Sequence, residues 1–255
     1  MKKIILLLAL LSVIVLMTSC QKAEEVTVSK YFHAMAVNDR DTMATMAYEP
    51  RDVEYKAFEV LSIDEPVTTP LELPALIKKL AEFERKRGEQ VNKVMNMTDE
   101  RDDLEYEVEE TRRSSRKAEL KKKIEELNVQ IEEETEKVKS LQLDINQAKK
   151  EIDREKALIT LSTGFRDNLE MFSGETLTNK VTVKVTLEND EVKDYIFLLR
   201  MDTLKLEDRE QAGRLIVVKF MTTDEYEKEI KEKEAVVEEV EEVSEAETAT
   251  EEEQG

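Results

Sequence analysis

The chain has 255 residues and a formal net charge of −20, and 38% of its residues are charged. With 5 glycines, 4 prolines and no tryptophan, this composition is atypical of a compact enzyme and favours long helices. The charge argues against nucleic acid as a partner, because a polyanion is bound through clustered Lys and Arg.

The first 20 residues have the layout of a secretory signal peptide. Lys2 and Lys3 precede the apolar run IILLLALLSVIVLM, and Thr18 and Ser19 then lead to Cys20, the only cysteine. As a helix, a run of about 14 residues would span about 21 Å, which is short of the roughly 30 Å hydrocarbon core. We therefore expect a cleaved signal rather than a permanent transmembrane helix.

The sequence LMTSC, which ends at Cys20, resembles the lipobox of bacterial lipoproteins. The small residue Ser19 stands directly before the cysteine, while Met17 takes the place where Leu is commonest. The resemblance implies that residues 1–19 are removed and that Cys20 carries diacylglycerol and often an N-acyl chain. Two or three acyl chains hold a protein stably at a membrane, whereas one holds only marginally. The alternative is an ordinary cleaved signal with an incidental thiol.

The residue after the cysteine bears on localisation. Gln21 is not the aspartate that retains many enteric lipoproteins at the inner membrane. The resemblance therefore implies a lipid-anchored protein of the cell envelope, at the outer membrane and facing the periplasm if the host has two membranes.

The segment before the long helices predicts two helices and a strand. Residues 26–50 predict one helix with an apolar face and a second, short helix capped by Asp41 that carries Met43 and Met46. The run VEYKAFEVLSI, residues 53–63, predicts a strand.

The clearest pattern is a seven-residue repeat in the middle of the chain. Between residues 120 and 159, one heptad position holds only β-branched residues and the other holds Leu or Ala, except at Glu134 and Glu155. The residues of the two series are Ile124, Ile131, Val138, Ile145, Ile152 and Ile159, and Leu120, Leu127, Leu141 and Ala148. This repeat predicts a coiled coil in which the polar interruptions are solvated positions or pins of the register.

A weaker repeat of the same step runs from Leu73 to Val108, interrupted by Arg87, Gln90 and Arg101. We expect an antiparallel hairpin over residues 71–162, with arms of about 60 Å and a turn at residues 112–119. If facing residue numbers add up to about 235, Arg101 lies opposite Glu134. The alternative is one continuous helix that dimerises in parallel.

The chain turns to a β pattern after the coiled coil. The runs VTVKVTL (181–187), YIFLLRM (195–201) and GRLIVVKF (213–220) predict three strands. Residues 223–255 form a low-complexity acidic tail, which we expect to be largely disordered beyond a short helical extension.

The order of these elements resembles the nuclear transport factor 2-like fold, a curved sheet wrapped by helices. The residues that carry the likeness are Tyr31, Phe32, Ala34, Asp39, Gly213 and Arg214. The expected fold class is therefore α+β, with a small helix-and-curved-sheet domain split into residues 20–70 and 163–222 around the inserted hairpin.

The residues give no catalytic, metal or cofactor site. His33 is the only histidine, and no phosphate or calcium loop is present. Some enzymes of the resembled fold place an acid and a tyrosine in the pocket of the sheet. Tyr31, Tyr55 and Tyr195 are the candidates to line such a pocket. Because they have no evident carboxylate partner, we favour the alternative that they pack in the core.

These observations predict a noncatalytic lipoprotein, anchored through Cys20, whose coiled-coil arm acts as a scaffold or spacer. Its partners would be the membrane and a protein or a second copy of the chain, with no nucleic acid and no cofactor. The alternative is a lipoprotein that binds an apolar or cell-envelope ligand in the pocket of the α+β domain.

Overall fold

The computed structural model describes residues 22–207, 209–232 and 234–235. These residues form two compact units, which we describe separately. The sheet unit comprises the described residues up to Pro70, Leu158–Arg166 and the described residues from Gly174 onward. The arm unit comprises Leu71–Ala157 and Asp167–Ser173.

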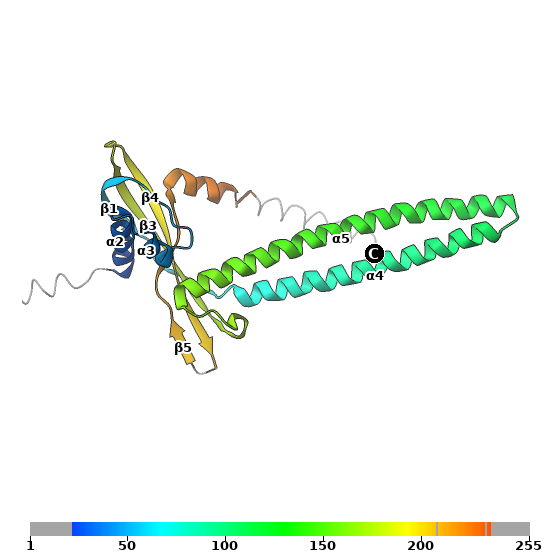
Figure 1. Ribbon diagram of the computed structural model, residues 1–255, viewed down its shortest axis with the longest axis horizontal. Helices are drawn as coiled ribbons and strands as arrows, with labels where there is room; N and C mark the ends of the chain where they lie inside the picture. Colours follow the sequence, from blue (N-terminus) through cyan, green and yellow to red (C-terminus); the bar gives the residue numbers. More distant parts are fainter. Residues whose placement is uncertain (1–21, 208, 233, 236–255) are drawn as a thin grey trace, which may run out of the picture. The chain divides into compact units, whose positions relative to one another are not determined.

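The sheet unit is a curled antiparallel sheet preceded by two helices, so the coarse class is α+β (Figure 1). The helices are α2 (Ala23–Ala36) and α3 (Arg40–Met46), and the strands are β1 (Tyr55–Ile63), β2 (Val67–Pro70), β3 (Ser173–Leu187), β4 (Val192–Leu206), β5 (Arg209–Ala212) and β6 (Ile216–Thr222).

Two long strands form the centre of the sheet, and each has two short strands along its outer side. β3 pairs with β1 and β2, and β4 pairs with β5 and β6. The two central strands extend well beyond the runs that predicted them, and β2 and β5 were not predicted. The strand expected at residues 213–220 begins only at Ile216.

Alternating side chains explain why the central strands pack on the helices. Val181, Val183 and Val185 of β3 are fully buried, as is Phe197 of β4. Because alternate residues of a strand share one face, these side chains line the same side of the sheet. The residues packed there form one core with Val28, Tyr31, Phe32, Met35 and Met43 from α2 and α3.

The cap of α3 differs from the prediction. Asp39, rather than Asp41, stands at the N-cap and accepts a hydrogen bond from the backbone N of Thr42 at 3.0 Å. Asp41 lies in the first turn, where its charge still favours the helix N-terminus. The left-handed backbone of Asn38, with φ of 53°, ends α2 early enough for Asp39 to become the cap.

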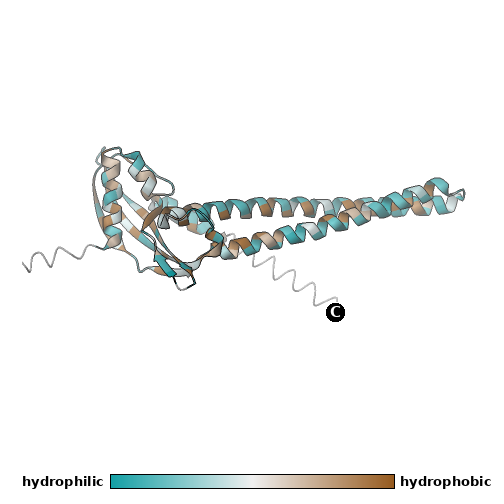
Figure 2. Ribbon diagram, turned by 60° about the horizontal axis from the view of Figure 1, so that its bottom comes forward, coloured by the Kyte–Doolittle hydropathy of each residue, from teal (hydrophilic) through white to brown (hydrophobic). Residues whose placement is uncertain are grey.

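The arm unit is built from two long helices that run antiparallel. α4 (Leu73–Glu110) has 38 residues and α5 (Ser114–Thr163) has 50. The break between them lies at residues 111–113, so the chain has two helices rather than one continuous helix. A short 3-10 helix, η1 (Leu169–Met171), also belongs to this unit. Figure 2 shows polar and apolar segments alternating along both long helices.

The heptad positions of α5 are the buried ones. Leu120, Ile145 and Ala148 are at most 2% exposed. Glu134 and Glu155 occupy the same seam and are only 8% and 4% exposed, so of the two expected roles, solvated positions or pins of the register, the first is wrong. Glu134 instead has polar partners within the arm, as described below.

The register of the hairpin also differs from the prediction. Glu134 contacts Gln90 and Lys93, whereas Arg101 pairs with its own neighbours Asp102 and Glu105. The numbers of Gln90 and Glu134 add up to 224 rather than 235. The cause is the turn, which spans residues 111–113 instead of 112–119, so its centre lies earlier in the chain and the facing residue numbers add up to less.

Candidate functional site

Cys20, the expected lipidation site, lies outside the described residues, as does the segment before it. The acidic residues after position 235 lie outside them too, while residues 223–232 and 234–235 are helical. No helix within the described ranges is long and apolar enough to span a bilayer.

The three tyrosines that were candidates to line a pocket are part of the core, as the favoured alternative of packing predicted. The Tyr31 hydroxyl donates to the carbonyl O of Arg51 at 2.9 Å and accepts from its backbone N at 2.8 Å. The Tyr55 hydroxyl donates to the carbonyl O of Phe32 at 2.7 Å. Tyr195 stacks on Phe220 with ring centroids 4.9 Å apart. The hydroxyls of Tyr31 and Tyr55 are therefore used in fixing the backbone.

The surrounding rings fill the space between α2 and the sheet. Phe32 stacks on Phe58 at 4.2 Å and meets Phe197 and Phe220 edge-on at 5.6 and 5.9 Å. Such ring pairs add stabilisation beyond their buried area. Phe32 and Phe197 are fully buried, so this part of the interior is a packed aromatic core.

The tyrosines are also poorly suited to proton transfer. Burial raises the pKa of Tyr31, and desolvation raises that of Tyr55. A general acid or base works best with a pKa near the working pH, so these shifts move the hydroxyls away from such a role. His33 is exposed on α2, and the described residues contain no cluster of three or more possible metal ligands.

The sheet unit contains a buried polar cluster that was not predicted from the sequence. The Arg200 guanidinium donates from Nε to Asp202 Oδ1 at 2.8 Å, and the Thr176 hydroxyl donates to the same oxygen at 2.8 Å. Arg200, Asp202 and Thr176 are 7%, 0% and 4% exposed. A buried charge pair needs hydrogen bonds to offset its loss of hydration, and here both of these bonds go to Oδ1 and link β3 to β4.

The cluster continues into the last turn of α5. The Asp202 backbone N donates to Ser162 Oγ at 2.9 Å, and Ser162 Oγ donates to the carbonyl O of Arg214 at 3.0 Å. Gly213 stands so close that an added Cβ would lie 2.5 Å from Ser162 Oγ. These contacts fix the end of α5 to the β4–β6 region of the sheet. These hydrogen bonds therefore have a structural role.

The sequence carries one signal for this cluster. Arg200 and Asp202 interrupt the apolar run YIFLLRMDTL two residues apart, so both fall on one face of the strand. Their partner Thr176 comes from β3 and Ser162 from α5, and only the fold brings those residues to the cluster.

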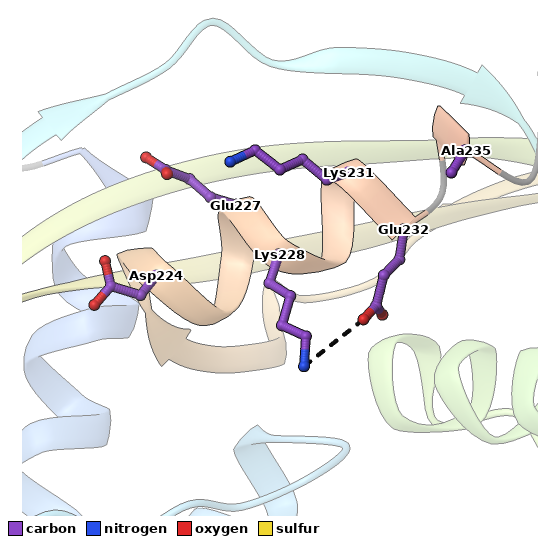
Figure 3. A pocket seen from close by; sticks show the side chains of 6 residues that line it. All are labelled: Asp224, Glu227, Lys228, Lys231, Glu232 and Ala235. Carbon is purple, nitrogen blue, oxygen red and sulfur yellow. Dashed lines mark ion pairs between the residues drawn. The ribbon is translucent and has the colours of Figure 1, made fainter.

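A surface hollow of about 400 Å³ lies along the helix that follows β6 (Figure 3). Five of its six lining residues are charged: Asp224, Glu227, Lys228, Lys231, Glu232 and Ala235. Lys228 pairs with Glu232 at 3.8 Å. With both signs of charge on successive turns of one exposed helix, this hollow has no group of residues aimed at a common ligand atom.

The arm contains one polar layer within its apolar seam. Lys93 and Lys137 donate to Glu134 Oε1 at 2.8 and 3.1 Å, and Gln90 donates to Oε2. The hydrogen bond from Lys93 is the main cause that lowers the pKa of Glu134. Because a polar group at one seam position accepts few alternative partners, this layer pins the pairing of α4 with α5.

The free end of the arm carries many exposed charges. Arg116 of α5 reaches Glu107 of α4 at 3.0 Å, and it also pairs with Glu119 at 3.1 Å within its own helix. Exposed charged side chains surround this pair on both helices.

Comparison of the chain with protein-family models, with curated proteins and with solved structures found no match.

Proposed function

We propose that the protein is a noncatalytic lipoprotein of the cell envelope, anchored through acyl chains on Cys20, whose arm acts as a scaffold or spacer. The observation that carries this proposal is the arm itself: a hairpin of two helices, 38 and 50 residues long, pinned by one polar layer. At 1.5 Å per residue, α4 alone is roughly 57 Å long.

The lipid anchor rests on the sequence. A basic start, an apolar run and the LMTSC motif precede a cysteine that is the only one in the chain. In the structure, α2 begins three residues after Cys20, at Ala23. Three residues span at most about 10 Å, so an anchor at Cys20 would hold the sheet unit close to the membrane surface. Outer-membrane placement, facing the periplasm, is part of the proposal for a host with two membranes.

We further propose that the sheet unit is a nuclear transport factor 2-like domain interrupted by the arm. Two helices packed on the concave core of a curled antiparallel sheet support this assignment. The ligand-binding alternative needs an open pocket beside Tyr31, Tyr55 and Tyr195. Because the rings of Tyr31 and Tyr195 are buried and Tyr55 packs against Phe32 and Phe58, the structure gives that alternative no support.

The scaffold proposal is tested by cross-linking in cells from the free end of the arm. A photoreactive side chain replaces Ser115, which is exposed beside the turn. A spacer predicts adducts whose identity changes when one heptad is removed from each helix, because the arm then shortens by about 10 Å. The control is the chain with the full-length arm and the same photoreactive group at position 115.

Two outcomes contradict the proposal. One is the absence of any adduct with the full-length arm. The other is an adduct pattern that does not depend on arm length, which would mean that the reach of the arm is irrelevant to its contacts.

A further inference from the structure

The distal end of the arm carries opposite charges on its two helices. Residues 99–110 of α4, the acidic flank, contain eight acidic residues and one arginine. Residues 112–123, the basic flank, contain seven basic residues and one glutamate. The basic flank stands out in a chain whose net charge is −20.

Few of these charges neutralise each other within the chain. Among the described residues, the ion pair between Arg116 and Glu107 is the one that joins the two flanks. Arg101, Arg116 and Lys122 otherwise pair within their own helices. Exposed acids and bases without an ion pair remain on each flank: Asp99, Glu100, Asp103 and Glu109 on the acidic one, and Arg112, Arg113, Lys121 and Lys123 on the basic one.

This separation of charge selects the kind of partner. A uniformly anionic surface would attract the basic flank and repel the acidic flank at the same end of the arm, and a cationic surface would do the reverse. A second copy of the chain offers both signs in the same arrangement. Around a twofold axis, the acidic flank of each copy meets the basic flank of the other, so one contact is made twice.

We propose that two copies of the chain associate through the distal ends of their arms, acidic flank against basic flank. This inference deepens the proposed function and rests on it in treating the arm as the contact element. Because the charges are exposed, the contact weakens with salt, and its range at physiological ionic strength is about 8 Å. Charge complementarity of this kind favours encounter and selects the partner.

The test is photo-cross-linking of the full-length chain in cells with Tyr106→p-benzoylphenylalanine. Tyr106 is 64% exposed in the middle of the acidic flank. Two copies of the chain are coexpressed, each with a different epitope tag, and an adduct that carries both tags contains two copies. We expect such an adduct for the otherwise unchanged chain.

Two charge-reversed variants separate this contact from any other. One variant carries Arg112→Glu, Lys121→Glu and Lys123→Glu, which takes the net charge of the basic flank from +6 to 0, and the other carries Asp99→Lys, Glu100→Lys and Asp103→Lys, which takes the acidic flank from −7 to −1. Each should lose the adduct at least tenfold because the attraction between the two flanks is then nearly abolished. Coexpression of the two variants should restore a mixed adduct, which also shows that both arms fold.

A matched control reverses two exposed lysines nearer the other end of the arm, Lys78→Glu and Lys150→Glu. It should leave the adduct unchanged, because only the distal flanks are complementary. A chain that ends at Ala235 should also keep the adduct, since the acidic tail is not the proposed occupant of the basic flank.

Several results would overturn the inference. They are no two-tag adduct for the unchanged chain, full adduct in both reversed variants, no restoration in the mixture, or loss of the adduct when the tail is removed. Adducts from position 115 with another protein, in the absence of a two-tag adduct, would leave the spacer proposal standing. A two-tag adduct from a chain that proves not to be anchored through Cys20 would support the self-association and contradict the anchored spacer.

Discussion

The sheet unit and the arm are stabilised in different ways. In the sheet unit, fully buried rings and β-branched residues lie between α2 and the sheet, and a buried Arg–Asp pair fixes the end of α5. In α4, by contrast, Leu73 is the one fully buried residue, and the seam is otherwise half-buried. The sheet unit has an interior that excludes partners, whereas most of the arm surface is open to them.

The largest effect is expected in the aromatic core. Phe32→Ala removes a fully buried ring that contacts four others, and should lower the free energy of unfolding of the sheet unit by about 3–5 kcal/mol. Tyrosine fluorescence in urea measures this change. Val37→Ala, at a side chain that is 60% exposed, should change it by less than about 0.5 kcal/mol. Similar losses in the two variants would contradict a packed core.

Two glycines should respond with opposite signs. At Gly174, whose φ is 154°, an added Cβ would lie 1.9 Å from the carbonyl O of Thr203, so Gly174→Ala should destabilise the sheet unit by about 1–3 kcal/mol. At Gly88 in α4 nothing lies within 4 Å, and Gly88→Ala should stabilise the helix by roughly 0.8–1 kcal/mol. Thermal unfolding followed by circular dichroism measures both. Shifts of the same sign would contradict the close strand contact or the open helix position.

The polar layer of the arm should limit its stability while fixing its pairing. Glu134→Leu replaces a charged seam residue by the residue typical of that heptad series, so the helical melting midpoint of the arm should rise. Far-UV circular dichroism follows the melt. Glu133→Leu, at the exposed neighbouring position, is the control and should leave the midpoint nearly unchanged. A midpoint that falls in Glu134→Leu would mean that the layer is a net stabiliser.

The smallest effect is a dependence on acid pH. Arg51 donates to Glu225 at 2.6 and 3.1 Å, and this pairing is the main cause that lowers the Glu225 pKa from 4.5 to about 2. Because the folded pKa is lower than the unfolded one, the stabilisation is complete above pH 4.5 and is lost between pH 4.5 and about 2. Both side chains are more than 40% exposed, so solvent screening keeps the contribution below about 1 kcal/mol.

The Glu225→Gln variant checks this assignment. It removes the titrating group, so the stability difference from the unchanged chain should be present at pH 6 and vanish near pH 2. Urea unfolding at both pH values measures the difference. A constant difference across this range would show that Glu225 does not titrate with the lowered pKa.

The sequence predicted the regular parts of the fold well for a physical reason. The heptad repeat of α5 and the alternation of valines in β3 are local patterns that bury one face of an element. The burial of Leu120, Ile145 and Val183 follows from them. Helix α3 was also predicted, although its cap was assigned two residues too late.

The features that were missed depend on residues far apart in the chain. The hairpin register follows from a turn of three residues that contains neither glycine nor proline, so no residue type marks its position. The partners of Glu134 depend on that register. The polar cluster around Asp202 depends on β3, β4 and α5 meeting.

Membrane fractionation of the full-length chain with and without Cys20→Ser tests the proposed lipid anchor most directly. The unchanged chain should sediment with the membranes and incorporate labelled palmitate, whereas Cys20→Ser should incorporate none and appear in the soluble fraction with unchanged circular dichroism. A Cys20→Ser chain that remains with the membranes, or an unchanged chain without acyl label, would contradict the anchor and with it the proposed spacer.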